Sequence, residues 1–414
     1  ATPAAGMAAP QPSARGAACD KFHVMEVVAA AAAREASGGD VVHMEVGQPG
    51  GRPPEAVLRA AREALDDPSE TIGYTPGPGR ARLLRAIAAH YASEYGVDLD
   101  ADEVVAVTGS SAAFALSFLA AFDAGDIVYT AAPGYPCYVN ILKTLGVDVR
   151  ALPVGSDTNF QLTPHVLDAA VSACSDDAER ARVRGVVVAS PSNPTGTVLD
   201  ADELRALCEW ASARGAWLVS DEIYHGITYG DVKCHTAREF SDSAIVINSF
   251  SKLYCMTGWR LGWMLVPKAL RAAVGALQCN MFINAPTLSQ RAAGEAAFEC
   301  AAELRERVKG YERNRAALLE ALPECGFPEL SSAQGAFYLY ARVEHLLRPG
   351  TGVSTSVELC EELLRDAGVA CAPGIDFDKS RGHLFVRFSY CGEYERVCEG
   401  ISRLRAWYAR RRAD

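Results

Sequence analysis

The sequence is poor in lysine, in basic charge overall and in paired cysteine motifs, and each shortage excludes a class of protein. Of its 40 basic residues only seven are lysines, and 51 acidic residues give the 414-residue chain a net charge of −11. A chain this acidic lacks the positive surface that nucleic acids and anionic lipids select for. We therefore expect neither nucleic acid nor a membrane among its partners.

The 13 cysteines are spread from Cys19 to Cys398 without a C-x-x-C pair or a paired Cys/His spacing. This spacing predicts free thiols in a reducing compartment, and neither a disulfide framework nor a metal site. The longest weakly polar run, residues 104–122, is interrupted by the small polar residues 108–111. It is therefore predicted to be a strand, a tight turn and a buried helix, and not a membrane span.

The first nineteen residues are rich in alanine, proline, serine and glycine, with one arginine and no acidic residue. We predict that residues 1–20 are disordered, because such a segment offers little to a packed core. This interpretation, together with the free thiols, predicts a cytoplasmic protein. Organelle targeting by the same segment stays open as the alternative.

From about residue 40 onward, short β-branched runs alternate with longer segments of helical period. This alternation is typical of an α/β fold built around a mostly parallel sheet. Beyond about residue 290 the pattern changes to long predicted helices at 291–322 and 358–367, around short strands at 336–341 and 383–389. The change predicts a second, smaller domain. The predicted division is a large domain at 49–290, a small domain at 291–414, and an N-terminal segment at 21–48 that packs with the small domain.

Three consecutive predicted strands each end in a polar motif. The strands cover residues 185–189, 216–220 and 244–248, and they continue into Ser190–Gly196, Asp221–Tyr224 and Ser249–Lys252. Open α/β sheets bind their ligands at the carboxyl ends of the strands, so we expect a site there. An earlier strand leads through the turn at 108–111 into a helix, whose first N–H groups are expected to face an anion.

Lys252 is the strongest single candidate for chemistry. No acidic residue lies among its near neighbours, whereas Lys21, Lys233 and Lys379 each lie within two positions of an aspartate. Apolar surroundings lower the pKa of an amine and free its lone pair, which suits a Schiff-base lysine. Taken alone, a lysine that reaches out of an apolar loop explains the same residues equally well.

Five other side chains point to chemistry mainly in combination. Asp221 ends a buried strand and needs a partner, which in isolation is as well supplied by a structural arginine. Asn193 also suits a simple turn, and Arg387 also suits a salt bridge between domains. Tyr74 and Tyr135 also suit packing. Together with Lys252 and the anion-binding turn, they form the set of groups that holds pyridoxal 5′-phosphate.

The ordered motifs SPSNPTG (190–196), SDEIY (220–224) and NSFSKLYCMTGWRLGW (248–263) resemble those of the class I/II aminotransferase family. These are fold-type I pyridoxal-phosphate enzymes of the aspartate aminotransferase superfamily, and the resemblance covers roughly residues 40–395. It implies an α/β fold, with a large domain whose mostly parallel seven-stranded sheet is flanked by helices, and a smaller α+β domain. It also implies pyridoxal 5′-phosphate as the cofactor and a homodimer with shared active sites.

By this resemblance, three residues are catalytic. Lys252 corresponds to the lysine that forms the Schiff base with the cofactor and then moves the substrate proton. Asp221 corresponds to the carboxylate that keeps the pyridine nitrogen of the cofactor protonated. Tyr224 corresponds to the tyrosine that, with Asn193, hydrogen-bonds the phenolic oxygen of the cofactor.

The other implied contacts hold the cofactor and the substrate. Tyr135 corresponds to the aromatic residue that stacks on the cofactor ring. The groups implied for the phosphate are Ser110, Ser111, Ser249, Ser251, Arg260 and, from a neighbouring subunit, Tyr74. The groups implied for the α-carboxylate of the substrate are Arg387, Asn193 and Gly47.

Two departures from the family pattern bear on the substrate. Many members read V-G-x-P-D, whereas this chain reads Val46-Gly-Gln-Pro-Gly50, so the loop over the substrate is expected to differ. Members specific for dicarboxylates add a second arginine, and the segment 279–286, where several members carry a substrate-pocket residue, has no basic residue. We therefore predict a ping-pong aminotransferase for a neutral, apolar or aromatic L-amino acid and a 2-oxo acid. A dicarboxylate aminotransferase of the aspartate type is less favoured.

Two further functions remain alternatives. A pyridoxal-phosphate C–S lyase acting by β-elimination uses the same Lys, Asp and Arg set, so the motifs do not separate it from an aminotransferase. A non-catalytic regulator that only binds the cofactor has no need of intact Lys252, Asp221 and Arg387, and it is therefore disfavoured.

Overall fold

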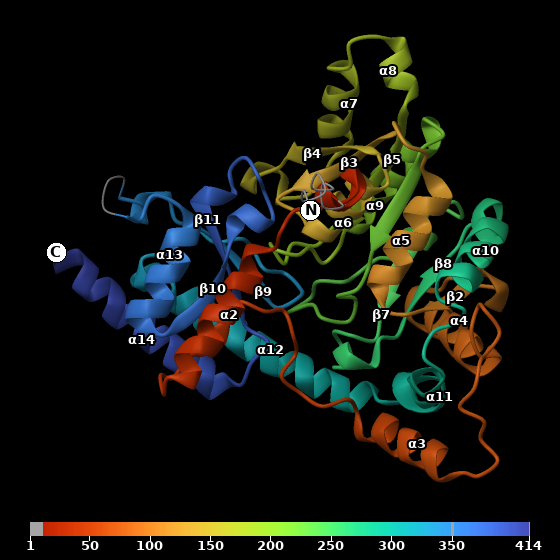
Figure 1. Cartoon of the computed structure of the whole chain (residues 1–414), viewed down its shortest axis with the longest axis horizontal. Helices are drawn as coiled ribbons and strands as arrows, with labels where there is room; N and C mark the ends of the chain where they lie inside the picture. Colours follow the sequence, from red (N-terminus) through yellow and green to blue (C-terminus); the bar gives the residue numbers. More distant parts are fainter. Residues whose placement is uncertain (1–10, 349–351, 414) are drawn as a thin grey trace, which may run out of the picture.

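The computed structural model describes residues 11–348 and 352–413 and contains a large and a small β-sheet (Figure 1). The large sheet has seven strands, in the order β2 (Val104–Val107), β8 (Gly262–Leu265), β7 (Ile245–Ser249), β6 (Trp217–Asp221), β5 (Val183–Ala189), β3 (Ile127–Ala132) and β4 (Asp148–Pro153). Strand β8 is antiparallel to both of its neighbours, and all other neighbours are parallel. The predicted mostly parallel seven-stranded sheet is confirmed.

Helices cover both faces of the large sheet. On β5, Val186 and Val188 pack in one hydrophobic cluster with Leu204 of α9, whereas Val187 packs in another with Phe114 of α5. Strands buried on both faces need apolar residues at successive positions, as this strand has. The helices of this part are α3 (Glu55–Asp66), α4 (Ala81–Tyr95), α5 (Ser110–Ala121), α6 (Pro136–Thr144), α7 (Pro164–Ser172), α8 (Asp177–Ala181), α9 (Ala201–Ala213), α10 (Arg271–Met281) and α11 (Thr287–Ala296).

The small sheet joins the two ends of the chain. Its strands are ordered β1 (Val42–Met44), β10 (Val369–Pro373), β11 (Phe385–Ser389) and β9 (Tyr338–Arg342), and β1 pairs in parallel with β10. The accompanying helices are α2 (His23–Ala36), α12 (Ala301–Ala321), α13 (Ser356–Glu362) and α14 (Tyr394–Ala413). Figure 1 shows the red α2 lying among the blue C-terminal elements. We propose that the two sheets are the centres of the two domains expected from the sequence, with residues 21–48 belonging to the smaller one.

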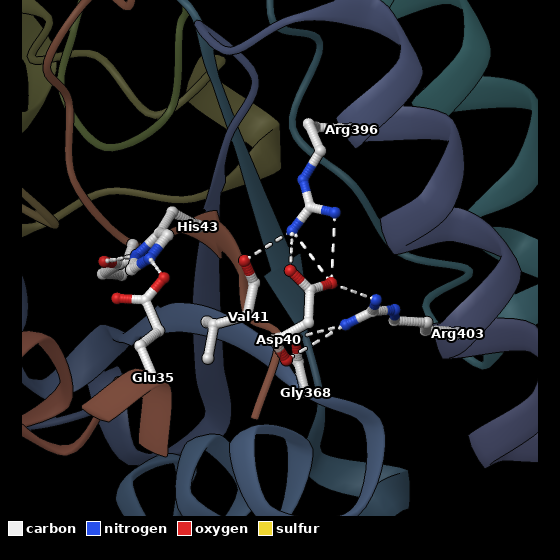
Figure 2. Close-up of polar contacts among 8 residues, drawn as sticks. Glu35, Asp40, Val41, His43, Gly368, Arg396 and Arg403 are labelled. Carbon is white, nitrogen blue, oxygen red and sulfur yellow. Dashed lines mark hydrogen bonds and ion pairs between the residues drawn. The ribbon is translucent and has the colours of Figure 1, made fainter. Parts of the chain in front are cut away.

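Asp40, close before β1, fastens the N-terminal segment to α14. Its carboxylate accepts hydrogen bonds from Arg396 at 3.0 and 3.1 Å and a further one from Arg403, whose Nη1 also reaches the carbonyl of Gly368 at 3.3 Å (Figure 2). These bonds, foremost the one from Arg396, lower the pKa of Asp40. The paired β1 and this ion cluster together hold the segment that leads into the site described below.

Two predicted helices differ from the observed ones. The helix predicted at 291–322 is interrupted by a 3₁₀ turn at Ala297–Glu299, because α11 packs against α3 and α4 whereas α12 packs against α14. The helix predicted at 358–367 begins earlier, at Ser356, where Thr355 caps it, and it ends in a π-helical turn at Leu363–Ala367. Tertiary packing decides the break between α11 and α12, whereas the earlier start of α13 follows from the local capping box of Thr355 and Glu358.

The N-terminal segment is partly described. The disorder predicted for residues 1–20 falls in its first half on residues 1–10, which lie outside the described residues. Ala14–Ala17 form the short helix α1, and the backbone N–H of Asp20 donates to Oδ1 of Asn140 on α6 at 3.3 Å. Across 11–348 and 352–413, no helix has both the length and the apolar character that a bilayer crossing requires.

Candidate active site

A cavity of about 430 Å³ lies where the carboxyl ends of β5 and β6 face the small sheet. It brings together every residue predicted for the site except Ser249 and Tyr74. The predicted residues that line it are Gly47, Ser110, Ser111, Tyr135, Asn193, Asp221, Tyr224, Ser251, Lys252, Arg260 and Arg387. They come from segments far apart in the sequence, so the fold itself assembles the site.

Lys252 follows β7 closely and extends into the cavity. Its Nζ donates to the carbonyl of Gly47 at 2.7 Å and lies 5.9 Å from the ring centre of Tyr224. Burial lowers the pKa of Lys252 to about 8; nearby Cys391 opposes this shift, and Arg387 adds to it. A substantial fraction of the amine is therefore unprotonated in mildly alkaline solution, which is the state that attacks a carbonyl carbon.

Asp221 is the last residue of β6 and is buried at the floor of the cavity. One carboxylate oxygen accepts from the N–H of Ile223 at 3.1 Å, and the other accepts from the hydroxyl of Tyr138. Burial raises the pKa of Asp221 to about 6, although these donors and Lys252 act against the shift. At neutral pH the site therefore holds a buried carboxylate that can pair with a cationic N–H group.

Tyr138, the donor to Asp221, was not among the residues predicted from the sequence. It lies on α6, three residues after Tyr135, and the two rings meet edge to face with centres 5.5 Å apart. Residues three apart on a helix share a face, so the spacing was the signal that could have found it. Tyr138 fixes the orientation of Asp221, while Tyr135 lines the same cavity.

Tyr224 contacts a second tyrosine, Tyr338, which was not predicted from the sequence. Its hydroxyl oxygen lies 2.6 Å from that of Tyr338 on β9, so the two form one hydrogen bond across the two sheets. Tyr338 also explains why residue 47 is a glycine, since a Cβ at Gly47 would lie 1.7 Å from the Tyr338 hydroxyl oxygen. The loop at Val46-Gly-Gln-Pro-Gly50 can therefore lie close over the cavity.

Arg387 lies on β11, and only some of its N–H groups donate to other residues. Its Nη1 donates to Oδ1 of Asn193 at 2.9 Å, and its Nη2 donates to the carbonyl of Glu45. The guanidinium lies between the rings of Tyr338 and Phe377, at 4.4 and 4.7 Å. Its Nε is buried and has no acceptor among the described residues. A planar guanidinium fixed in this way suits a carboxylate ligand.

The opposite end of the cavity suits an anion. Ser110 and Ser111 begin α5; in the described structure, no side chain caps this helix N-terminus and no acidic residue lies in its first turn. A Cβ at Gly109 would lie 2.3 Å from Nη2 of Arg260, so glycine allows the guanidinium to approach the helix. Free N–H groups, the helix dipole and an arginine together match a phosphate dianion.

Two predicted residues lie outside the cavity wall. The Ser249 hydroxyl donates to the carbonyl of Leu261 at 3.0 Å and lies 2.9 Å from the Ser251 hydroxyl oxygen, which places it behind Ser251. Ser251 lines the cavity and Ser249 does not. Tyr74 is 85% exposed and does not line the cavity of its own chain.

The cavity also has an apolar part that sequence reasoning missed. Phe22, Val24 and Met25 at the start of α2 line it together with Phe377. Asp376 holds this helix start in place, because its two carboxylate oxygens accept the N–H groups of His23 and Val24 at 2.8 Å each. No local sequence pattern predicts that these residues line the cavity, because they are brought there by the pairing of β1 with β10.

Comparison with known proteins shows to which family the chain belongs. The chain belongs to the class I and II aminotransferases, whose family model matches residues 39–404. It is therefore an aminotransferase, which transfers the amino group of an amino acid to a 2-oxo acid. The prediction made from the sequence motifs is confirmed. Enzymes of this family generally depend on pyridoxal phosphate.

Relatives resemble the chain over nearly its full length. It is 46% identical over 388 residues to a valine–pyruvate aminotransferase of Mycobacterium tuberculosis, covering 93% of this chain and 96% of the relative. It is 33% identical over 402 residues to an aspartate aminotransferase of Streptomyces avermitilis, covering 95% of each. A crystal structure of an aminotransferase from Mycobacterium tuberculosis superposes with a TM-score of 0.89 at 44% identity, covering 97% of this chain and 100% of that one.

Proposed function

We propose that this aminotransferase uses pyridoxal 5′-phosphate to transfer the amino group of a neutral L-amino acid with an apolar side chain, valine above all, to pyruvate. The observation that carries the proposal is the charge of the cavity wall. Among the described residues, its cations are Lys252, Arg260 and Arg387, and none is left over for a second substrate carboxylate. The resemblance to a valine–pyruvate aminotransferase supports this choice of substrates.

The residues present fit the cofactor. The amine of Lys252 suits its aldehyde, the carboxylate of Asp221 suits its ring N–H group, and the uncapped start of α5 beside Arg260 suits its phosphate. When bound, pyridoxal 5′-phosphate supplies an aldehyde carbon that carries the amino group and an aromatic ring that accepts electrons. Tyr135 lines the cavity where it can pack on that ring.

The chain's own groups then bind the substrate and move its proton. Arg387 grips the α-carboxylate, and Asn193, already bonded to Arg387, holds the grip in one orientation. Lys252 takes the proton from the substrate Cα, because its lowered pKa leaves the amine a usable base near neutral pH. Tyr224 would donate a hydrogen bond to the phenolic oxygen of the cofactor, and the negative charge of Asp221 would favour the protonated form of the ring nitrogen.

Apolar groups beside Arg387 favour a neutral substrate side chain. Phe377 packs on the Arg387 guanidinium at 4.7 Å, and Val24 packs against the cluster that contains Phe377. An aliphatic side chain placed here would bury carbon against carbon and exclude water from the reacting Cα. A carboxylate placed here would be desolvated without a cation, which is costly.

The reaction is tested on the cofactor-loaded enzyme with one substrate at a time. Valine alone should convert the bound cofactor to its amine form, and pyruvate should then restore the aldehyde form with release of alanine. Both steps are visible in the absorbance spectrum and in the products. Release of pyruvate and ammonia from a cysteine S-conjugate, with no amine form of the cofactor, would instead identify the β-eliminating lyase.

Arg387→Lys is expected to lower kcat/KM for every amino acid by about 10- to 100-fold, mainly through KM, because lysine keeps the charge but loses the planar two-point grip. The measurement is KM across valine, alanine and leucine. Arg342→Lys, which changes an exposed arginine on neighbouring β9, is the matched control and should leave KM unchanged. An unaltered KM in Arg387→Lys would show that another group binds the carboxylate.

We also propose a homodimer in which Tyr74 reaches the phosphate site of the second subunit. An exposed apolar patch supports it: Tyr74 is 85%, Ile72 45%, Met281 48% and Ile283 48% exposed. The two segments are adjacent, because the Thr287 hydroxyl donates to the carbonyl of Gly73 at 2.5 Å. Such patches on soluble chains mark interfaces.

Met281→Asp is expected to convert the dimer to a monomer and to weaken cofactor binding, because it places a charge on the apolar patch. Light scattering gives the mass, and dialysis against buffer gives the retained cofactor. Leu119→Asp changes an exposed apolar residue on α5, outside this patch, and should leave the mass at that of the dimer. A Met281→Asp protein that stays dimeric would place the interface elsewhere.

We further propose that the protein works in the cytoplasm. All 13 cysteines are free thiols, and most of them are buried. Free thiols suit a reducing compartment.

A further inference from the structure

We propose that Glu45 is a specificity-determining residue that disfavours substrates with a second carboxylate, so that pyruvate is accepted in preference to a 2-oxo diacid such as 2-oxoglutarate. This inference rests on the proposed function, because it concerns the choice of acceptor in that reaction. The described cavity wall holds no arginine for a second substrate carboxylate, which explains only why a diacid gains nothing here. Glu45 explains why a diacid is actively rejected.

Glu45 lies beside the group that is proposed to bind the substrate carboxylate. It follows β1 directly, is 2% exposed and lines the cavity. Its backbone carbonyl accepts a hydrogen bond from Nη2 of Arg387. Two residues later, the carbonyl of Gly47 accepts from Lys252. The segment that carries Glu45 therefore runs along the substrate, from the carboxylate grip to the catalytic amine.

The carboxylate of Glu45 is only half satisfied. One oxygen lies 2.8 Å from Nδ1 of His43, and the other is buried without a hydrogen-bond partner among the described residues. Buried polar atoms are nearly always paired, so a charged oxygen left unpaired at a binding cavity calls for an explanation. An unpaired negative charge kept at this position can serve to repel a ligand of the same sign.

His43 does not cancel the charge of Glu45, because the His43 ring also contacts a second carboxylate, that of Glu35. Its Nε2 lies 3.1 Å from Glu35 on α2, a contact visible in Figure 2. Burial works against a charged His43, but the bonds to Glu45 and Glu35 outweigh it and raise the pKa of His43. Even a protonated His43 faces two carboxylates, which leaves the cluster of Glu35, His43 and Glu45 with one net negative charge.

The other charges around the substrate are already engaged. Both oxygens of Asp376 accept N–H groups at the start of α2, where the positive end of the helix dipole offsets its charge. In the proposed reaction Arg387 binds the α-carboxylate, and Lys252 moves the proton of the substrate Cα, so neither is free to pair with a second carboxylate. A second substrate carboxylate would thus meet the unpaired charge of Glu45 in surroundings of low dielectric, where like charges repel strongly. The methyl group of pyruvate has no charge to repel.

Glu45→Gln tests the inference in the cofactor-loaded enzyme with valine as donor. Glutamine keeps the length of the side chain and an oxygen for His43 but removes the charge. We expect the ratio of kcat/KM for pyruvate over 2-oxoglutarate to fall by about tenfold or more, mainly through a lower KM for 2-oxoglutarate. Glu35→Gln is the matched control, since it removes a charge from the same cluster outside the cavity, and it should change the ratio far less.

A binding measurement separates charge from turnover. Calorimetric titration of the loaded enzyme with glutarate should show tighter binding in Glu45→Gln, while butyrate, which has one carboxylate, should bind as in the unaltered protein. His43→Gln gives a second variant that leaves Glu45 in place and removes its partial neutralisation. In it the preference for pyruvate should increase.

The outcomes are distinct. An unchanged acceptor ratio and unchanged glutarate affinity in Glu45→Gln would overturn the inference while valine-to-pyruvate transfer still stood. If Glu45→Gln does not fold, an unchanged ratio in His43→Gln would overturn it instead. If the unaltered enzyme transfers nothing to pyruvate, the proposed function fails, and the glutarate and butyrate affinities still decide whether Glu45 repels a second carboxylate.

Discussion

Replacing Lys252 by alanine is expected to reduce turnover by at least about 10²- to 10⁴-fold, the range that a positioned general base contributes. The variant should also lose the visible absorbance of the covalently held cofactor. The reason lies in the position of the amine, which points into the cavity, contacts the Gly47 carbonyl at 2.7 Å and has a pKa lowered by burial to about 8. No other lysine lines that cavity in the described part of the chain.

A readout on the cofactor-free protein supports the same assignment. Labelling of Lys252 by an amine-reactive reagent should be half-maximal near pH 8, two or more units below an ordinary lysine. Lys268→Ala, which changes an exposed lysine on the same stretch of chain, should keep both colour and turnover. The Lys252→Ala protein should be at least as resistant to heat as the unaltered one, since burying an amine costs stability. Near-normal turnover in Lys252→Ala would refute the assignment.

Asp221→Asn is expected to lower kcat by at least about a hundredfold, comparable to the loss of one preorganised electrostatic contact. The isosteric change removes the buried negative charge that is proposed to keep the cofactor nitrogen protonated. The carboxamide oxygen can still accept the Tyr138 hydrogen bond, while its NH₂ group takes the place of the oxygen that accepts from Ile223. Asp376→Asn is the matched control, because it removes another buried carboxylate from the same cavity wall. An equal loss of kcat in the control would mean that the total charge of the cavity, and not the position of the Asp221 carboxylate, determines kcat.

The same variant makes a stability prediction in the cofactor-free protein. Burial raises the pKa of Asp221 from 3.8 to about 6, so the folded state holds this proton more tightly than the unfolded state does. Its contribution to stability is therefore present below about pH 4 and is lost as the pH rises through about 6. At pH 7 Asp221→Asn should be more stable than the unaltered protein, as measured by urea unfolding. The gain is at most roughly 3 kcal/mol, because the amide loses the hydrogen bond that Ile223 donates. A variant of lower stability at pH 7 would contradict the raised pKa.

The parts of the fold that local sequence encodes were predictable. The strand predicted at 185–189 lies within β5, where apolar residues stand at successive positions. Asp200 and Glu203 form a capping box at the start of α9, and Gly215 lies just past its end with φ of 59°. These features need only neighbouring residues, and for this reason they could be derived without tertiary information.

The candidate site was predictable where its residues lie at strand ends or in ordered motifs, as Asp221 and Lys252 do. Residues brought in by distant pairing were missed. Tyr338 enters through β9, and Glu45 and Phe22 enter because β1 pairs with β10 more than 300 positions along the chain. Ser249 fits the motif, yet its hydroxyl is used by Leu261, a contact that the motif does not reveal. Such placements depend on which segments meet, and no local pattern records that.

The rate of the first half-reaction tests most directly whether the enzyme prefers a neutral amino acid as its donor. The cofactor-loaded enzyme is mixed with valine or with aspartate, without an oxo acid, and conversion of the bound cofactor to its amine form is followed by stopped-flow absorbance. The cavity offers Arg387 for one carboxylate and the side chains of Val24, Met25 and Phe377 for an apolar substrate side chain. Conversion should therefore be faster with valine by at least about tenfold at equal concentration. Faster conversion with aspartate would contradict the proposed preference, because the cavity wall of the described residues offers no cation beyond Lys252, Arg260 and Arg387.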